Sequence, residues 1–169
     1  MSAPGDDIVI RQADGNDLDG VVRVGRTVMR ATNAALMESE LVDLLADKFW
    51  TSDANTAAIR AGRTLVCGAG ANGRDIVAMA SYGNQDGRVV IWKLYVLPEY
   101  QGLGLARRLV ETIIERVEHD VDAVFLAIHE GSDGARAFAD ATGFIETERE
   151  EQAGMPKLIW LRRQLGGEA

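Results

Sequence analysis

A glycine-rich segment between a strand-like stretch and an amphipathic stretch constrains this chain more than any other feature. Residues 101–106 read QGLGLA. The apolar residues of the stretch that follows recur three and four positions apart: Ala106, Leu109, Val110, Ile113 and Val117. This spacing predicts a helix with one buried face. The first N–H groups of a helix have no acceptor within it, and the helix dipole adds partial positive charge there. The sequence therefore predicts an anion-binding loop at a strand-to-helix junction.

A second glycine-rich segment, GAGANG at residues 68–73, has the spacing of a dinucleotide-binding fingerprint. That fingerprint holds a pyrophosphate only where a helix begins at its end. Residues 76–82 instead have the composition of a strand, so we interpret the segment as the turn of a β-hairpin. A nucleotide-dependent oxidoreductase is the alternative, and a strand at 76–82 would exclude it. The 101–106 loop lacks the GK(S/T) of a P-loop, which argues against nucleoside triphosphate hydrolysis.

The hydrophobic pattern of the whole chain predicts an α+β fold, with a mainly antiparallel sheet and helices packed on it. Strands are expected at residues 8–10, 64–67, 76–82, 89–96, 124–128, 144–147 and 158–161. Helices are expected near residues 18–29, 41–50, 52–61, 106–117 and 132–143, with a break at 31–36. The expected N-caps are Asp17, Ser52 or Asp53, and Ser132 or Asp133. The turns between residues 64 and 96 are rich in Gly, Asn and Asp, which is typical of antiparallel connections.

Length and composition limit the classes of protein that fit. The 169 residues suit one domain, expected to span residues 1–169. The net charge of −8 argues against binding to nucleic acid or to an anionic membrane. The single cysteine, Cys67, excludes an intrachain disulfide, and with two histidines it makes a metal site unexpected. The N-terminal MSAPGDD lacks the apolar core of a signal peptide and no apolar run approaches a membrane span, so we expect a cytoplasmic protein.

The segment LYVLPEYQGLGLA at residues 94–106 resembles the acetyl-CoA-binding motif of the GNAT superfamily of N-acetyltransferases. That motif reads Q/R-x-x-G-x-G/A after a strand and a V-x-P turn. The matching residues here are Val96, Pro98, Gln101, Gly104 and Ala106. A second family motif is a strand, then a helix with A-x-x-F-Y, then G-F. Its matching residues are Ala135, Phe138, Gly143 and Phe144. In sequence and strand order the resemblance covers about residues 64–150.

The resemblance implies a sheet in which two central strands splay apart, with the pantetheine arm of acetyl-CoA in the gap. Backbone groups of the strand before the loop would bind that arm. N–H groups of the loop and of the first helical turn would bind the pyrophosphate. The implied cofactor-binding residues are Leu94, Tyr95, Val96, Gln101, Gly102, Leu103, Gly104, Leu105, Ala106, Arg107 and Ser132.

Two positions depart from the family pattern. Ser132 stands in place of the usual Asn, where its hydroxyl would either reach the pantetheine or cap the helix. Ala139 stands in place of a Tyr that protonates the departing CoA thiolate in many relatives. An amine attacks a thioester only as the free base, so a proton acceptor is still needed. Candidate bases are His129, Glu130 and Glu99, and candidate acids are Tyr95, Tyr100, Ser132 and His129.

The function that the resemblance implies is acetyl transfer from acetyl-CoA to a primary amine by direct attack in a ternary complex. No metal and no covalent acyl-enzyme are expected. The acceptor is a small molecule or a protein amine, and the acidic net charge favours a cationic one. The alternative is a CoA-binding sensor or interaction module that has lost catalysis, as Ala139 and Ser132 would allow. Family members often dimerise, so the resemblance leaves open whether this protein forms a homodimer.

Overall fold

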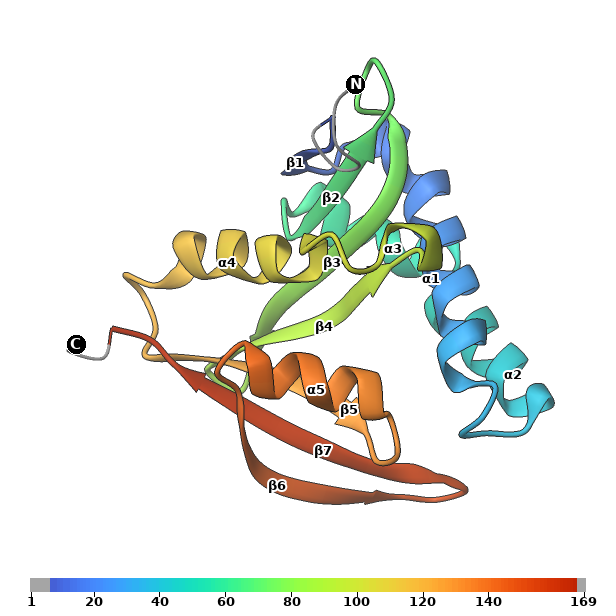
Figure 1. Ribbon diagram of the computed structural model, residues 1–169, viewed down its shortest axis with the longest axis vertical. Coiled ribbons are helices and arrows are strands. Elements are labelled where there is room, and N and C mark those ends of the chain that lie inside the picture. Colours follow the sequence, from blue (N-terminus) through green and yellow to red (C-terminus); the bar gives the residue numbers. More distant parts are fainter. Residues whose placement is uncertain (1–6, 167–169) are drawn as a thin grey trace.

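The computed structural model describes residues 7–166, which form a seven-stranded sheet in the order β1-β2-β3-β4-β5-β7-β6 (Figure 1). The strands are β1 (Val9–Gln12), β2 (Thr64–Ala69), β3 (Asp75–Gln85), β4 (Arg88–Val96), β5 (Ala123–His129), β6 (Ile145–Gln152) and β7 (Met155–Gln164). The helices are α1 (Leu18–Asn33), α2 (Ser39–Phe49), α3 (Ser52–Arg60), α4 (Leu105–Val117) and α5 (Asp133–Ala141). Neighbouring strands pair antiparallel except β4 and β5, which are parallel. The predicted α+β class with a mainly antiparallel sheet is confirmed.

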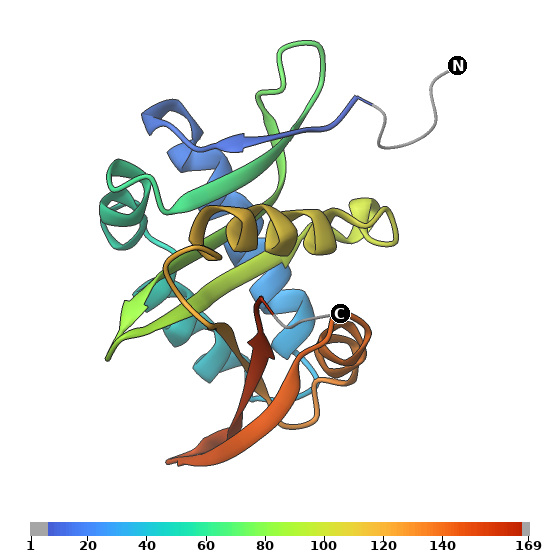
Figure 2. The ribbon, with the colours of Figure 1, turned by 90° about the vertical axis from the view of Figure 1, so that its left-hand side faces the viewer.

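Helices cover both faces of the sheet (Figures 1 and 2). Helices α1 and α3 pack on one face of β3, and α4 packs on its other face. Residues 76–81 of β3 are buried without interruption, as expected for a strand with helices on both sides. The GAGANG segment forms the end of β2 and most of the β2–β3 turn. Because residues 76–82 form a strand, the oxidoreductase alternative is wrong.

The parallel strands β4 and β5 separate near the middle of the sheet. They pair from Val89 with Val124 to Ile91 with Leu126, and no further. β3 stays paired with β4 as far as Val96. The opposite edge of β4 beyond Ile91 therefore has no strand partner among the described residues, and its backbone groups face the gap. The splayed central strands that the resemblance implies are confirmed.

β4 carries one extra residue where the strands separate. Tyr82 pairs with Ile91 and the adjacent Ser81 pairs with Lys93, so Trp92 is a bulge residue. A bulge resets the alternation of side chains along a strand. Beyond it, Lys93 and Tyr95 point toward α2 and α3.

The C-terminal hairpin and the first helix are longer than expected. Strands β6 and β7 extend over 145–152 and 155–164, where the sequence predicted only 144–147 and 158–161. β6 is an edge strand of mostly charged, exposed residues, so it lacks the apolar alternation by which a strand is recognised. Helix α1 continues to Asn33, three residues into the predicted break at 31–36.

Asp17 occupies the predicted N-cap position of α1 without a capping bond, and the N-cap prediction for α3 is wrong. The Asp17 side chain makes no capping bond to α1, because its carboxylate accepts hydrogen bonds from Arg11 and from the Asp14 N–H instead. Helix α3 is capped by Thr51, whose Oγ1 accepts from the Ala54 N–H at 3.1 Å, and not by Ser52 or Asp53.

The prediction about the N-terminal MSAPGDD falls almost wholly on residues 1–6, which lie outside the described part of the chain. Within residues 7–166, no helix combines the length and the apolar character needed to cross a membrane.

Candidate active site

A cavity of about 1240 Å³ opens where β4 and β5 separate. Segments of α1, the α2–α3 region, β4, the 101–107 loop, the end of β5 and α5 line it. The predicted site residues among its lining are Leu94, Tyr95, Val96, Gln101, Gly102, Gly104, Leu105, Ala106, Arg107, His129 and Ser132. Leu103 and Glu130 do not line it. The fold thus brings together residues from two motifs that lie more than twenty positions apart in the sequence.

The 101–107 loop forms an open helix N-terminus at the edge of this cavity. Gly104 occupies the N-cap position with φ of 77°, a left-handed conformation that favours glycine. The first bond of the helix runs from the Arg108 N–H to the Gly104 carbonyl at 3.0 Å. The N–H groups of Leu105, Ala106 and Arg107 therefore have no helical acceptor, and the first turn carries no acidic residue. This end of α4 is chemically suited to an anion such as a pyrophosphate.

Two contacts hold this loop in place. The Gln101 side chain donates to the Val96 carbonyl at 3.2 Å, which ties the loop to the end of β4. The Leu103 side chain packs against the hydrophobic core, so only the backbone of this residue is available to a ligand. A Cβ placed on Gly102 or Gly104 would meet nothing within 4 Å, because both positions face open space.

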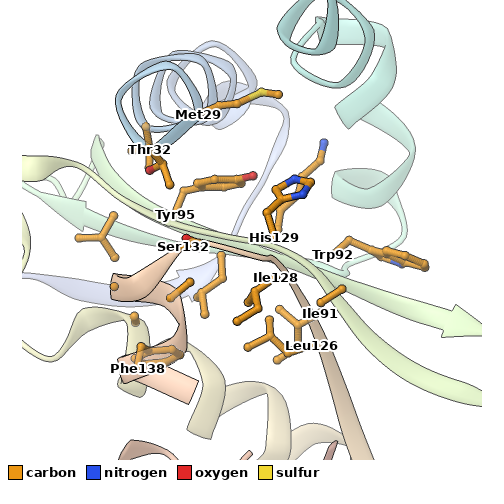
Figure 3. A pocket seen from close by; sticks show the side chains of 18 of the residues that line it. Met29, Thr32, Ile91, Trp92, Tyr95, Leu126, Ile128, His129, Ser132 and Phe138 are labelled. Carbon is orange, nitrogen blue, oxygen red and sulfur yellow. The ribbon is translucent and has the colours of Figure 1, made fainter. Parts of the chain in front are cut away.

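His129 ends β5 on the same side of the sheet as Tyr95, Met29 and Thr32 (Figure 3). Its Nδ1 is buried and has no hydrogen-bond partner among the described residues. Burial lowers the pKa of His129 below its usual value, because desolvation disfavours the imidazolium. The ring is therefore a neutral imidazole at pH 7, able to accept a proton.

Glu130 and Glu99, the other candidate bases, lie outside the cavity lining. Both are exposed, and the Glu130 carboxylate accepts a hydrogen bond from Arg149 at 2.9 Å. This ion pair holds the Glu130 side chain against β6.

Tyr95 packs edge-on against Trp50, with ring centroids 5.2 Å apart and an interplanar angle of 78°. Burial raises the pKa of Tyr95 to about 12, so its hydroxyl keeps its proton at neutral pH. Tyr100 also lines the cavity. Both phenols thus belong to the cavity lining.

The second motif lies at the start of α5. Ser132 occupies the N-cap position, but its side chain makes no capping hydrogen bond and lines the cavity. Ala139 is fully buried in the core, so no side chain projects from this position into the cavity. Among residues 7–166 no group of three or more His, Cys, Asp or Glu side chains could hold a metal ion.

Lys93 is a cavity residue that the motif analysis missed. Its ammonium donates to Asn55 Oδ1 at 2.7 Å and to the Phe49 carbonyl at 3.0 Å, and it lies 4.1 Å from the Trp50 ring centroid. Desolvation lowers the pKa of Lys93 to about 8. The sequence signal for it is a lone lysine within the otherwise apolar run VVIWKLYV.

Solved structures with the same fold are numerous. PaiA N-acetyltransferase from Thermoplasma acidophilum, solved with coenzyme A, aligns with a TM-score of 0.79 at 16% identity, over 97% of this chain and 99% of that one. YncA from Salmonella typhimurium, solved with acetyl-CoA, aligns with a TM-score of 0.72 at 23% identity, over 96% of each chain. The ribosomal-protein-S18-alanine N-acetyltransferase from Escherichia coli aligns with a TM-score of 0.69 at 18% identity, also over 96% of each chain.

A search of curated protein sequences gives no match to this chain. The family model for the acetyltransferase (GNAT) family matches residues 29–144. That span includes the strand β4, the open N-terminus of α4 and the start of α5, which all line the cavity. The chain therefore belongs to the GNAT family of acetyltransferases.

Proposed function

We propose that this protein transfers the acetyl group of acetyl-CoA to a primary amine, with both substrates bound at once. The observation that carries the proposal is the cavity at the β4–β5 separation. It has an anion-binding helix end at one part of its wall and a neutral histidine at another. PaiA and YncA, which share the fold, were solved with coenzyme A and acetyl-CoA.

The residues of this chain fit the chemical groups of acetyl-CoA. The free N–H groups of Leu105, Ala106 and Arg107 would bind the pyrophosphate, with Gly102 and Gly104 allowing its close approach. The unpaired edge of β4 at residues 94–96 would hydrogen-bond the pantetheine arm through its backbone. Acetyl-CoA supplies an acyl group activated as a thioester.

Acetyl transfer from the thioester to the amine requires one proton acceptor and one proton donor. As the amine nitrogen bonds to the thioester carbonyl carbon, the carbon–sulfur bond breaks and the amine loses a proton. We assign that proton to the neutral imidazole of His129, directly or through one water. We assign the proton that the departing thiolate takes up to a phenol of the cavity, Tyr95 or Tyr100, which regains a proton from the protonated His129 or from solvent water.

Direct transfer is favoured over an acyl-enzyme by the state of Cys67. This thiol is fully buried in β2, and burial raises its pKa to about 12. A thiol of this kind forms almost no thiolate at neutral pH and meets no substrate.

A CoA-binding module without turnover is the second candidate, favoured by the buried Ala139 in place of a tyrosine. The deciding measurement is acetyl-CoA-dependent thiol release across a panel of primary amines, alongside calorimetric binding of CoA. Turnover with any amine supports the transferase. Tight CoA binding without turnover supports the module, and no binding of CoA contradicts both.

A further inference from the structure

The wall of the cavity is short of negative charge, although the protein as a whole carries a net charge of −8. Among the described residues, Asp133 is the one carboxylate in the lining, and it lies at the first turn of α5. Three Arg and Lys side chains line the cavity, Arg63, Lys93 and Arg107, in addition to the neutral His129. Arg107 belongs to the proposed pyrophosphate site. Arg63 and Lys93 lie apart from it, at the β2 and β4 side of the cavity.

Neither Arg63 nor Lys93 forms an ion pair with a described residue within 4.0 Å. Arg63 donates to the Tyr82 carbonyl at 3.2 Å, and Lys93 donates to the Asn55 amide oxygen and to the Phe49 carbonyl. All three of these acceptors are neutral. Arg63 and Lys93 are therefore two cations of the cavity lining that have no carboxylate partner among the described residues.

The Lys93 ammonium has one N–H group without an oxygen acceptor among the described residues, and the Trp50 ring centroid lies 4.1 Å from its nitrogen. It carries three N–H groups, and the protein acceptors account for two of them. Asn55, the residue that fixes its position, is 3% exposed and donates its own amide hydrogens to the Phe49 and Thr51 carbonyls. The lysine is thus held by a rigid, neutral support. An anionic ligand would return its lowered pKa toward the ordinary value.

The surfaces around Lys93 are largely apolar. The Trp50 ring lies 4.1 Å from its nitrogen and packs edge-on against Tyr95, and Phe49 and Trp92 also line the cavity. Met29, Leu36 and Leu45 continue this lining toward α1 and α2. A hydrocarbon or aromatic body would be buried here with favourable free energy.

We infer that the acceptor is a small amine that bears a carboxylate and an apolar body, such as an apolar α-amino acid, and that Lys93 binds its carboxylate. The inference rests on the proposed function and narrows its substrate class. It opposes the expectation of a cationic acceptor from net charge, because the acidic residues lie elsewhere, for example along the exposed edge strand β6. A polyamine would bring further positive charge against Lys93 and Arg63, with Asp133 as the one compensating carboxylate in the described lining.

The test compares amines that differ in the carboxylate alone. L-Phenylalanine, L-phenylalaninamide and phenethylamine share one apolar body, and spermidine represents polycations. Thiol release is measured with the wild type, Lys93→Met and Lys93→Arg. Lys157→Met is the matched control, because Lys157 pairs with Glu151 at 3.2 Å and does not line the cavity.

We expect wild-type kcat/KM to be highest for L-phenylalanine, mainly through KM. Lys93→Met should lower the ratio of kcat/KM for L-phenylalanine to kcat/KM for phenethylamine at least about tenfold, which is the scale of a hydrogen bond to a charged group. Lys93→Arg should keep most of this ratio, and Lys157→Met should leave it unchanged. Equal or better activity with phenethylamine or spermidine in the wild type would overturn the inference while leaving the transferase function intact.

Binding separates failure of the inference from failure of the proposed function. The same compounds are titrated into CoA-saturated wild type and Lys93→Met by calorimetry. Selective binding of L-phenylalanine that Lys93→Met weakens supports the carboxylate site, even where no amine is turned over. Equal affinity for L-phenylalanine, L-phenylalaninamide and phenethylamine would contradict the carboxylate site. The absence of any binding of L-phenylalanine would also contradict it.

Discussion

His129 combines a position at the β4–β5 gap with a buried, unbonded Nδ1. His129→Gln should lower kcat about a hundredfold, the usual scale for loss of a general base, with CoA affinity unchanged. Because burial lowers the pKa of His129, the acidic limb of the pH profile of kcat/KM should have its midpoint below pH 6.5 in the wild type. The limb should disappear in the variant. Stopped-time thiol assays between pH 5 and 9 would measure both effects.

Two variants serve as controls for His129. Glu130→Gln should be nearly silent, since the Glu130 carboxylate is exposed and paired with Arg149 outside the cavity lining. His119→Gln removes a histidine whose side chain is 90% exposed and should also be silent. If Glu130→Gln shows the loss instead, the base is Glu130. If His129→Gln and Glu130→Gln both stay fully active, a water chain to solvent removes the proton.

Asp17 is the most buried carboxylate among residues 7–166, at 2% exposure. Its two oxygens accept from the Arg11 guanidinium at 2.7 and 2.8 Å, and one also accepts from the Asp14 N–H at 2.8 Å. Asp17→Asn should lower the free energy of unfolding by about 3 kcal/mol, since it leaves the arginine without its charged partner. Urea unfolding at pH 7 would measure this. Asp43→Asn, which breaks an exposed pair with Arg30, should cost less than about 1 kcal/mol.

Asp17 also predicts a pH dependence of stability. The hydrogen bond and charge of Arg11 hold the pKa of this carboxyl below its usual value. The stabilisation is therefore complete above the unfolded pKa of about 4 and is lost as the pH falls through the folded pKa. Wild-type stability should drop below about pH 4, and Asp17→Asn should show a shallower drop. Identical pH profiles for the two proteins would contradict this account.

At the scale of the elements, the cofactor site that we propose depends on the N-terminus of α4. Gly104→Glu should abolish CoA binding by calorimetry, because a carboxylate would stand where the pyrophosphate is expected. Gly87→Glu is a matched control in the β3–β4 turn, with φ of 82° and an equally open site. Both variants carry the same backbone strain and charge. Wild-type CoA affinity in Gly104→Glu would show that this loop does not hold the cofactor.

For the molecule as a whole, CoA binding should raise thermal stability, since a ligand that binds only the native state shifts the folding equilibrium. At about one hundred times the dissociation constant the gain is about 2.7 kcal/mol, or about 5 to 10 °C in Tm for a domain of this size. Differential scanning fluorimetry would measure the shift. NAD at the same concentration should produce none. A shift with NAD and none with CoA would contradict the choice of glycine loop.

The sequence predicted local structure correctly where that structure depends on residues adjacent in the sequence. The QGLGLA segment opens a helix because its glycines and the apolar spacing from Ala106 onward lie within consecutive turns. GAGANG forms a hairpin connection because strand-forming residues flank it on both sides. The length of β6 could not be predicted, since its charged side chains are held by pairs such as Arg136 with Glu146, contributed by a different element.

The α+β class and the open N-terminus of α4 can thus be predicted from consecutive residues, because the hydrophobic period and the chemistry of a helix end are local properties. The character of the acceptor side depends on contacts between distant segments. Lys93 acquires its place in the cavity from a bulge at Trp92 and from Asn55 and Trp50, which lie about forty residues earlier. Our inference about the acceptor differs from the one that net charge favours, because a sum over the chain does not say which charges the fold buries and which it leaves on the surface.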